Sequence, residues 1–406
     1  MKKKITLLTI SLLLIFAMVA LPGCGQNPVE STPVDSSSDM SVGDSSGVVS
    51  NTAPSGTSAH AAGTQEGSTT TLSASSGTSK TEANSTTGRP ASVTTTKKKT
   101  VMMPTTTKGG YSSSGSIQGI AAPSSFSGRF MYKTSAGKEL GIMVEQPLTK
   151  KYEKAPFVLQ IIGGGWCAGT VEKHITGVFG RSEAVSLLND GWGLVTISYR
   201  GIDNGERLPE LVADIMDGIG YLQVYESVFK LDCKNIITCG GSAPGHLSLL
   251  LATAPKDILT KYCEYPVRAY RVIGCMSING FGALYPIDGN YMYGDKVNDP
   301  YIPLFGSTYA EDPEIRKQYS PLTYISQTTP PLMLLYGTHD DTVDPKQTLT
   351  LKSVCDQKKA SAELIKCQNG DHNLQSANGE AVTPGKTEYL AKFFAFAKTC
   401  YSQSNS

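Results

Sequence analysis

The sequence lacks features that would mark several functional classes. Its 36 basic and 35 acidic residues give a formal net charge of +1, so the excess of basic charge expected of a nucleic-acid-binding protein is missing. Only five histidines occur in 406 residues, and they are too dispersed to form a recognisable metal site. No internal repeat is evident. We therefore expect neither nucleic acid nor a metal ion as a partner.

The N-terminal segment is typical of an export signal. Three lysines at positions 2–4 precede an apolar stretch at residues 5–20, which is short for the ~20 residues of a membrane span. The sequence Leu-Pro-Gly-Cys at 21–24 then resembles a bacterial lipobox. That resemblance implies signal cleavage, lipid attachment to Cys24 and a cell-surface protein anchored to the membrane. The alternative is an ordinary secretory signal with an incidental cysteine.

A polar segment separates this signal from the rest of the chain. Residues 25–125 are mostly Ser, Thr, Gly and Ala, with almost no aromatic or β-branched aliphatic clusters. Such a composition cannot bury a core, so we expect a disordered linker. A coil of ~100 residues has a root-mean-square span of ~55 Å and would act as a tether. Residues 126–402 have the length and apolar content of one large domain.

Nine cysteines occur in the chain. If Cys24 carries lipid, the remaining eight lie in the predicted folded domain. Cys355 and Cys367 are the pair we expect to form a disulfide, because they would link a predicted helix to the next strand. Several of the others lie in apolar strand patterns and are expected to be buried free thiols.

The pattern of apolar residues predicts an α/β fold. Residues 129–133 and 140–145 alternate apolar and polar side chains around a turn, as in a β-hairpin. Helical periodicity occurs between the later apolar runs, for example at 208–222. We expect a mostly parallel sheet with helices on both faces, and a partial cap over the site from residues 281–330. The predicted buried strands are 157–162, 194–199, 235–239, 272–278, 332–336 and 363–367.

A strand, a tight turn and a helix surround Ser242. The predicted strand leads into Gly-Gly-Ser-Ala-Pro-Gly-His at 240–246, followed by a leucine-rich helix. Such an elbow presents a serine hydroxyl above the sheet and marks Ser242 as a candidate nucleophile. Pro244 occupies the fifth position of the G-x-S-x-G pattern, where glycine is expected. A proline there is compatible with a first helical turn, but it biases Ala243 away from helical dihedral angles.

Three consecutive glycines follow the buried strand 157–162. Backbone N-H groups in such a loop are accessible to a ligand because no Cβ obstructs them. The N-H groups of Gly164 and Gly165, together with that of Ala243, are candidates for an oxyanion hole. A phosphate-binding loop is disfavoured because no Lys-Ser or Lys-Thr follows. A purely structural glycine turn is the remaining alternative.

These motifs together resemble those of a known family. The Gly-Gly-Gly-Trp run resembles the HGGGW loop of the carboxylesterase and hormone-sensitive-lipase branch of α/β-hydrolases, and is similar to that of bacterial feruloyl and acetylxylan esterases. The resemblance extends over about 158–372 and includes Ser-Tyr-Arg at 198–200 and Ser-Pro-Leu-Thr-Tyr at 320–324. It implies the α/β-hydrolase fold. The sequence departs from the family at Ile162, which replaces the family histidine that braces the loop.

The resemblance also suggests an acid and a base. Residues 337–347 resemble the family's HG-x-x-D-x-x-V-P-x-x-Q loop, and the spacing implies Asp340 as the acid, with Asp341 and Asp344 as rivals. His372 is the only histidine after this loop, which gives the chain order Ser, Asp, His. His372 is therefore the candidate general base. The weaker histidine candidates are His60, His174, His246 and His339, of which His174 could reach substrate and His246 is expected to pack or cap a helix.

The predicted activity is hydrolysis of carboxylic esters by a serine nucleophile through an acyl-enzyme, a mechanism that requires no cofactor. By analogy with the family, the substrate would be a small ester or an acetyl or feruloyl group on a polysaccharide. Two alternatives stay open. The departures at Ile162 and Pro244 suggest a non-catalytic envelope protein that uses the fold for binding, and a serine peptidase of the prolyl-oligopeptidase type is the other.

Overall fold

The computed structural model describes residues 120–125, 127–135, 137–169, 171, 178–294 and 298–405. The predicted signal, Cys24, nearly all of the predicted linker, His60 and His174 lie outside these residues. Ile120 already packs in the same hydrophobic cluster as the first strands, with 8% of its surface exposed. The core therefore includes a residue from just before the predicted domain boundary.

One eight-stranded sheet forms the centre of the domain, in the order β1-β2-β4-β3-β5-β6-β7-β8. β1, β2 and β4 pair antiparallel, and the strands from β4 to β8 pair parallel. The predicted hairpin and the six predicted strands all form in this sheet. Burial is confirmed for the inner strands, whereas β8 at the edge is partly exposed, with Glu363 and Lys366 facing solvent. The strands are β1 (Gly128–Ser135), β2 (Lys138–Glu145), β3 (Ala155–Ile161), β4 (Gly193–Ile197), β5 (Leu231–Gly241), β6 (Arg271–Ile278), β7 (Leu332–Gly337) and β8 (Ala362–Cys367).

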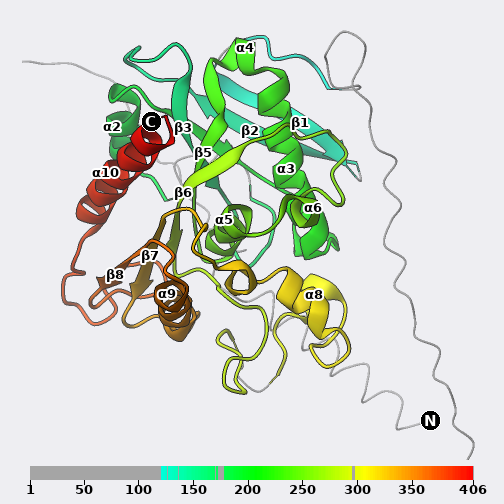
Figure 1. Cartoon of the computed structure of the whole chain (residues 1–406), viewed down its shortest axis with the longest axis vertical. Helices are drawn as coiled ribbons and strands as arrows, with labels where there is room; N and C mark the ends of the chain where they lie inside the picture. The colour runs from blue at the N-terminus through cyan, green and yellow to red at the C-terminus, as the bar shows by residue number, and fades with distance from the viewer. Residues whose placement is uncertain are drawn as a thin grey trace, which may run out of the picture. The chain divides into compact units, whose positions relative to one another are not determined.

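Helices cover both faces of this sheet, as Figure 1 shows. α2 and α10 pack on one face, whereas α3, α5 and α9 pack on the other. This is the α/β-hydrolase arrangement predicted from the sequence. The helices are α2 (Arg181–Asn189), α3 (Leu208–Val224), α4 (Glu226–Phe229), α5 (Ala243–Thr253), α6 (Lys256–Leu259), α7 (Ile302–Phe305), α8 (Pro313–Gln318), α9 (Lys346–Lys358) and α10 (Lys386–Ser404), with short 3₁₀ turns η2 (Ile202–Asn204) and η3 (Pro321–Tyr324).

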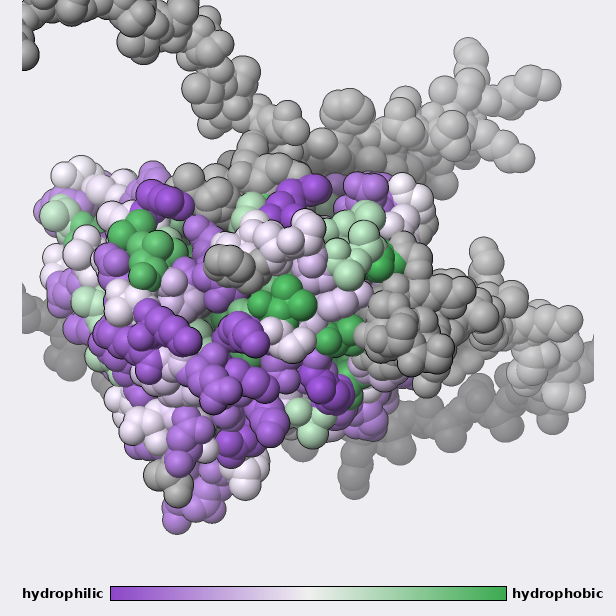
Figure 2. All heavy atoms as spheres, turned by 90° about the horizontal axis from the view of Figure 1, so that it is seen from above, coloured by the Kyte–Doolittle hydropathy of each residue, from purple (hydrophilic) through white to green (hydrophobic). Residues whose placement is uncertain are grey.

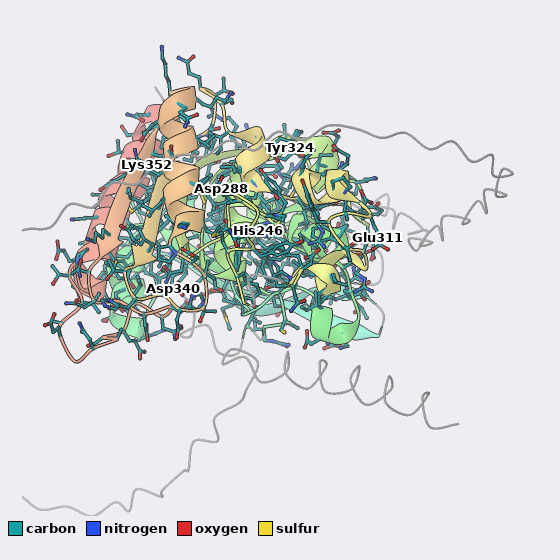
Figure 3. All side chains as sticks on the ribbon, turned by 90° about the horizontal axis from the view of Figure 1, so that it is seen from below. His246, Asp288, Glu311, Tyr324, Asp340 and Lys352 are labelled. Carbon is teal, nitrogen blue, oxygen red and sulfur yellow. The ribbon has the colours of Figure 1, made fainter. Side chains whose placement is uncertain are left out.

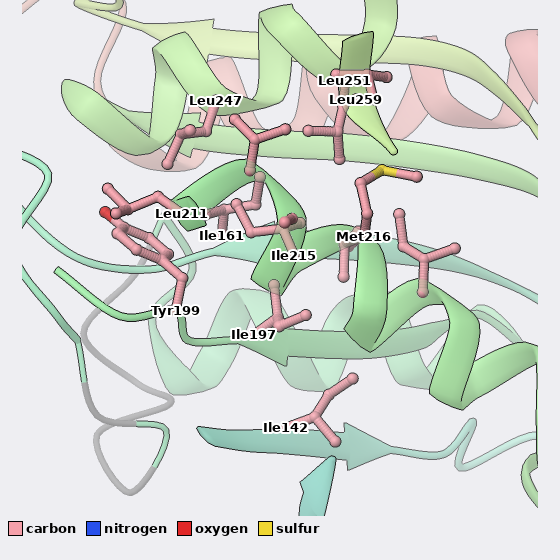
Figure 4. Packing of buried hydrophobic residues seen from close by; sticks show 14 of the residues in the cluster. Ile142, Ile161, Ile197, Tyr199, Leu211, Ile215, Met216, Leu247, Leu251 and Leu259 are labelled. Carbon is pink, nitrogen blue, oxygen red and sulfur yellow. The ribbon is translucent and has the colours of Figure 1, made fainter. Parts of the chain in front are cut away.

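The two faces have separate hydrophobic cores because side chains alternate along each strand. In β3, Leu159 and Ile161 pack in the cluster with α3 and α5, whereas Val158 packs in the cluster with α2 and α10. Figure 4 shows Ile161 beside Leu211 of α3 and Leu247 of α5. Burial on both faces explains why the central strands are mostly apolar.

The predicted disulfide between Cys355 and Cys367 is wrong, since both residues are buried free thiols. Cys355 on α9 packs with Leu332 and Leu334, whereas Cys367 at the end of β8 packs with Leu335. These two clusters lie on opposite faces of the sheet, so the sheet itself separates the sulfur atoms. The other cysteines in the described part of the chain are also free, and all except Cys167 are buried.

The segment between β6 and β7 contains α7, α8 and η3, and Figure 1 shows it in yellow at the lower end of the view. Arg316 of α8 anchors it. This side chain is fully buried and donates hydrogen bonds to Asp299 Oδ2 (2.8 Å) and to the Ser307 carbonyl oxygen (2.7 Å). An isolated bridge also pairs Tyr293 with Val343, which follows β7. The segment is thus tied to the loop that carries the candidate acid.

The surface seen in Figure 2 is mainly hydrophilic, and its hydrophobic residues form small separate groups. Scattered apolar residues of this kind are normal on a folded domain. In the part of the chain that the structure describes, no helix combines the length and apolar character needed to cross a membrane.

Candidate active site

Ser242 lies in a strained turn between β5 and α5. Its backbone dihedral angles are φ 58° and ψ −127°, a conformation that non-glycine residues rarely adopt. Its N-H donates to the Ile278 carbonyl oxygen (2.8 Å), and its own carbonyl accepts from the His246 N-H (3.0 Å). A Cβ at Gly240 would lie 2.5 Å from the Pro244 carbonyl group, so this sharp turn requires glycine there. The turn has the geometry of a nucleophile elbow.

Pro244 does not displace Ala243 from the helix. Ala243 is the first residue of α5 and Pro244 the second, and the His246 N-H closes the first turn on Ser242. The expected bias against helical dihedral angles at Ala243 is therefore overcome by the turn. Proline is tolerated because a first-turn N-H has no acceptor within the helix. For the same reason, the Ala243 N-H can be donated outside the helix.

Asp340 and His372 meet across the ends of β7 and β8. His372 Nδ1 lies 2.8 Å from Asp340 Oδ2, and only 1% of the Asp340 side chain is exposed. Asp340 Oδ1 accepts hydrogen bonds from the N-H groups of Thr342 (3.0 Å) and Val343 (2.9 Å). These backbone donors fix the carboxylate and leave its second oxygen for the imidazole.

The two rival carboxylates have other partners. Asp341 is exposed and accepts a hydrogen bond from the Thr342 hydroxyl (3.2 Å). Asp344 Oδ1 accepts from the Lys346 N-H (2.9 Å) at the start of α9. Among these three residues, Asp340 alone has a hydrogen bond to His372 in the described structure.

Asn279 links the loops that carry these side chains, and the sequence analysis missed it. It follows β6 with a left-handed φ of 47° and is 2% exposed. Its Nδ2 donates to the His372 carbonyl oxygen (2.7 Å), and its Oδ1 accepts from the Gly337 N-H (2.9 Å). Because Ser242 bonds to the adjacent Ile278, the three candidate triad loops lie side by side at the carboxyl ends of β5 to β8. The sequence does contain an Asn-Gly pair directly after a buried strand, which indicates a tight turn because asparagine tolerates a left-handed φ.

The glycine loop after β3 uses backbone conformations that favour glycine. Gly163 and Gly165 have φ values of 137° and 56°, and the Cys167 N-H donates to the Gly164 carbonyl oxygen (2.9 Å). A Cβ at Gly163 would collide with the Tyr199 hydroxyl, so glycine is required. Trp166, next in the loop, is 2% exposed. The loop is therefore packed tightly although Ile162 replaces the family histidine.

Aromatic residues of the segment before α8 surround Trp166. Its ring centroid lies 4.7 Å from that of Phe281, 5.9 Å from that of Tyr293 and 6.2 Å from that of Tyr301. The hydroxyl of Tyr293 would be 4.0 Å from a Cβ on Gly165. These contacts agree with the predicted partial cap, because they place this segment against the glycine loop.

The Ser-Tyr-Arg motif after β4 packs against the glycine loop. Tyr199 is fully buried and contacts Gly163. Arg200 donates two side-chain hydrogen bonds to Asp214 of α3, at 2.8 and 2.9 Å. Lys133 Nζ lies 2.8 Å from the same carboxylate. The buried Asp214 carboxylate thus binds both Arg200 and Lys133, and these charged hydrogen bonds fix the end of β4 next to the glycine loop.

The remaining described histidines are separate from the Asp340–His372 pair. His339 is exposed, with its Nδ1 3.0 Å from the Thr338 hydroxyl. His246 is fully buried on α5, and burial lowers its pKa to about 4. No group of three or more His, Cys, Asp or Glu side chains in the described part of the chain is placed to hold a metal ion.

The family model described as BD-FAE matches residues 144–354. The chain belongs to the BD-FAE family. The matched range contains the glycine loop, the Ser242 elbow and Asp340, whereas His372 lies beyond it. BD-FAE membership agrees with the resemblance to feruloyl-type α/β-hydrolases inferred from the motifs.

Curated relatives of this BD-FAE chain include two from Mycobacterium tuberculosis. A protein named probable carboxylic ester hydrolase LipM is 26% identical over 256 residues, which are 59% of this chain and 55% of that one. Esterase LipC is 24% identical over 201 residues, 48% of this chain and 46% of that one. The chain spans about half the length of the curated relatives it matches.

Solved structures with the same fold as this BD-FAE chain include two esterases. A truncated carbohydrate esterase from gut microbiota aligns with a TM-score of 0.53 and 21% identity, covering 69% of this chain and 99% of that one. A propionate-bound esterase from Thermogutta terrifontis aligns with a TM-score of 0.51 and 19% identity, covering 66% and 93%. At these identities the likeness establishes the α/β-hydrolase fold alone.

Proposed function

We propose that this chain is a serine esterase that hydrolyses carboxylic esters through an acyl-enzyme. The observation that carries the proposal is the 2.8 Å hydrogen bond between His372 Nδ1 and Asp340 Oδ2, made on loops adjacent to the Ser242 elbow. A strained serine, an acid and a base, in the chain order Ser242, Asp340, His372, form the machinery of acyl transfer.

The proposed mechanism has two steps. Ser242 Oγ attacks the ester carbonyl carbon while His372 Nε2 accepts the hydroxyl proton, and Asp340 stabilises the imidazolium that forms. The N-H groups of Gly164, Gly165 and Ala243 donate to the oxyanion, where one donor is typically worth ~3–4 kcal/mol of the barrier. The intermediate collapses by losing the alcohol, which takes the proton from His372. Water then repeats the sequence on the acyl-enzyme, releases the carboxylic acid and restores Ser242.

We propose short acyl groups, such as acetyl, or feruloyl groups on polysaccharide as substrates. The names of the relatives support an ester substrate, and the name of the carbohydrate esterase structure is compatible with a sugar ester. The test is hydrolysis by the wild-type chain of p-nitrophenyl acetate, methyl ferulate, acetylated xylan and a prolyl peptide anilide. We expect ester cleavage with release of acetate or ferulate. Cleavage of the anilide alone would favour the peptidase alternative, and no cleavage at all would favour the non-catalytic one.

We also propose that the enzyme is exported and held at the membrane by lipid on Cys24, on the strength of the N-terminal sequence. Replacing Cys24 with serine is expected to prevent lipid attachment and to move the protein from the detergent phase to the aqueous phase in a Triton X-114 partition of cells. Incorporation of labelled palmitate should be lost in parallel. Equal partitioning and labelling of both chains would contradict the anchor.

A further inference from the structure

A buried side-chain relay connects the glycine loop to the helix behind Ser242. The Nε1 of Trp166 lies 3.3 Å from His246 Nδ1, and His246 Nε2 lies 2.8 Å from the Tyr319 carbonyl oxygen. Because a carbonyl can only accept, His246 Nε2 carries the proton. His246 Nδ1 therefore has a free lone pair and accepts the indole N-H of Trp166.

This relay joins three segments that are distant in the sequence. Trp166 belongs to the glycine loop, His246 lies one turn after Ser242 on α5, and Tyr319 follows α8 in the segment that covers the loop. His246 is fully buried, and Figure 3 shows it in the middle of the domain, between Asp340 on one side and Glu311 on the other. The relay thus fixes the glycine loop relative to the helix that begins beside the nucleophile.

The protonation state of His246 allows its Nδ1 to accept the hydrogen bond from Trp166. The side chain is fully buried, and burial lowers its pKa to about 4, so the imidazole is neutral at ordinary assay pH. Only the neutral ring can accept from Trp166 while donating to Tyr319. The ring also packs edge to face against the Trp166 indole, with centroids 5.8 Å apart.

The glycine loop needs such a connection because the residue before it has no polar side chain. Ile162 is buried, with 6% of its surface exposed, and cannot donate or accept a hydrogen bond through its side chain. Trp166 has a left-handed φ of 58°, which a bulky residue adopts only when its surroundings hold it. The contacts of its indole provide that restraint.

We propose that His246 is a positioning residue for the oxyanion loop: by holding the Trp166 indole, it fixes the Gly164 and Gly165 N-H groups relative to Ser242. This inference rests on the proposed esterase function. His246 acts through Trp166 and does not touch the reacting atoms. Its contribution is therefore to the orientation of donors, whose displacement by ~1 Å can cost ~100-fold in rate.

The first test is Trp166→Phe, which keeps an aromatic ring but removes the indole N-H that His246 accepts, together with part of the ring that packs among neighbouring aromatic side chains. The His246 variants described below leave the indole intact and separate loss of the hydrogen bond from loss of packing. We expect kcat on p-nitrophenyl acetate to fall ~10- to 100-fold, with KM changed by less than about twofold. The affinity for a boronic acid, which forms a tetrahedral adduct with the serine, should fall by a similar factor.

Trp192→Phe is a matched control, because Trp192 is the other tryptophan of the chain and is equally buried at 1% exposure. Its Nε1 has no hydrogen-bond partner among the described residues, and it packs on the opposite face of the sheet. We expect kcat within about twofold of wild type. Circular dichroism and thermal midpoints of both variants would verify that each is folded.

A second pair of variants tests His246 directly. His246→Gln retains one acceptor and one donor, whereas His246→Leu retains neither. We expect the glutamine variant to keep a higher kcat than the leucine variant. The proposal is overturned if folded Trp166→Phe has wild-type kcat and boronate affinity. Failure of a fluorophosphonate to label the wild-type chain would instead overturn the esterase function itself.

Discussion

Replacing Ser242 with alanine is expected to abolish covalent labelling by a fluorophosphonate and to lower kcat for ester hydrolysis by about 10⁴- to 10⁶-fold. The reason is that Ser242 Oγ is the atom proposed to form the acyl-enzyme, and alanine leaves no nucleophile in the elbow. Oxyanion donors and substrate binding would remain, so a small residual rate above that in water is expected. The measurements are labelling followed by peptide mass spectrometry, and initial rates on p-nitrophenyl acetate.

Ser248→Ala provides a matched control on the same helix. Ser248 is fully buried on α5, and its Oγ has no hydrogen-bond partner among the described residues. Removing this hydroxyl should leave stability nearly unchanged, because no hydrogen bond is lost. Labelling and kcat should match those of wild type. Continued labelling of Ser242→Ala at wild-type yield would show that another residue is the nucleophile.

The elements of the fold were predictable because their signals are local. Burial of β3 on both faces makes residues 157–161 apolar except for the hydrogen-bonded Gln160, and alternation marks the hairpin of β1 and β2. The elbow was predictable for a similar reason, since a strand, small residues, serine and a helix are consecutive in the chain. A side chain at Gly240 would collide with Pro244, so the glycine two residues before Ser242 is a sterically required part of the motif.

The features that were missed or wrong depend on contacts between distant segments. Asn279 lies 93 residues from His372, and Trp166 lies 80 residues from His246. No periodicity or short motif encodes such pairs, because each partner alone matches an ordinary turn or core residue. The false disulfide has the same origin. Sequence placed Cys355 and Cys367 on consecutive elements, but only the folded sheet puts them on opposite faces.

The effect of Pro244 shows how a local bias can be overridden. Proline disfavours helical dihedral angles in the residue before it, and on that ground Ala243 was expected to deviate. The turn at Ser242 is instead fixed by hydrogen bonds to Ile278 and from His246, which set the start of α5. Tertiary and first-turn bonds thus outweigh a preference that is only statistical. Pro244 therefore gives no structural reason to regard the protein as non-catalytic.

Asp340→Asn is expected to lower kcat by about 10⁴-fold while leaving the chain folded. Asparagine Oδ1 can still accept from the Thr342 and Val343 N-H groups, so the loop should keep its shape. Its Nδ2, however, would donate toward His372 Nδ1 and favour the tautomer with a proton on Nε2. That imidazole cannot accept the Ser242 proton.

Asp341→Asn and Asp344→Asn make the same chemical change on the same loop and test whether the assignment is specific. Neither carboxylate has a hydrogen bond to His372 in the described structure; Asp341 accepts from the Thr342 hydroxyl, and Asp344 accepts from the Lys346 N-H. We expect both variants to retain kcat within about twofold, since neither change removes a hydrogen bond to the His372 imidazole. Steady-state rates for all three variants, with thermal midpoints to verify folding, decide between the carboxylates. If Asp340→Asn were as active as wild type while Asp341→Asn or Asp344→Asn lost activity, the acid would be the other residue, and the Asp340–His372 bond would only position the loop.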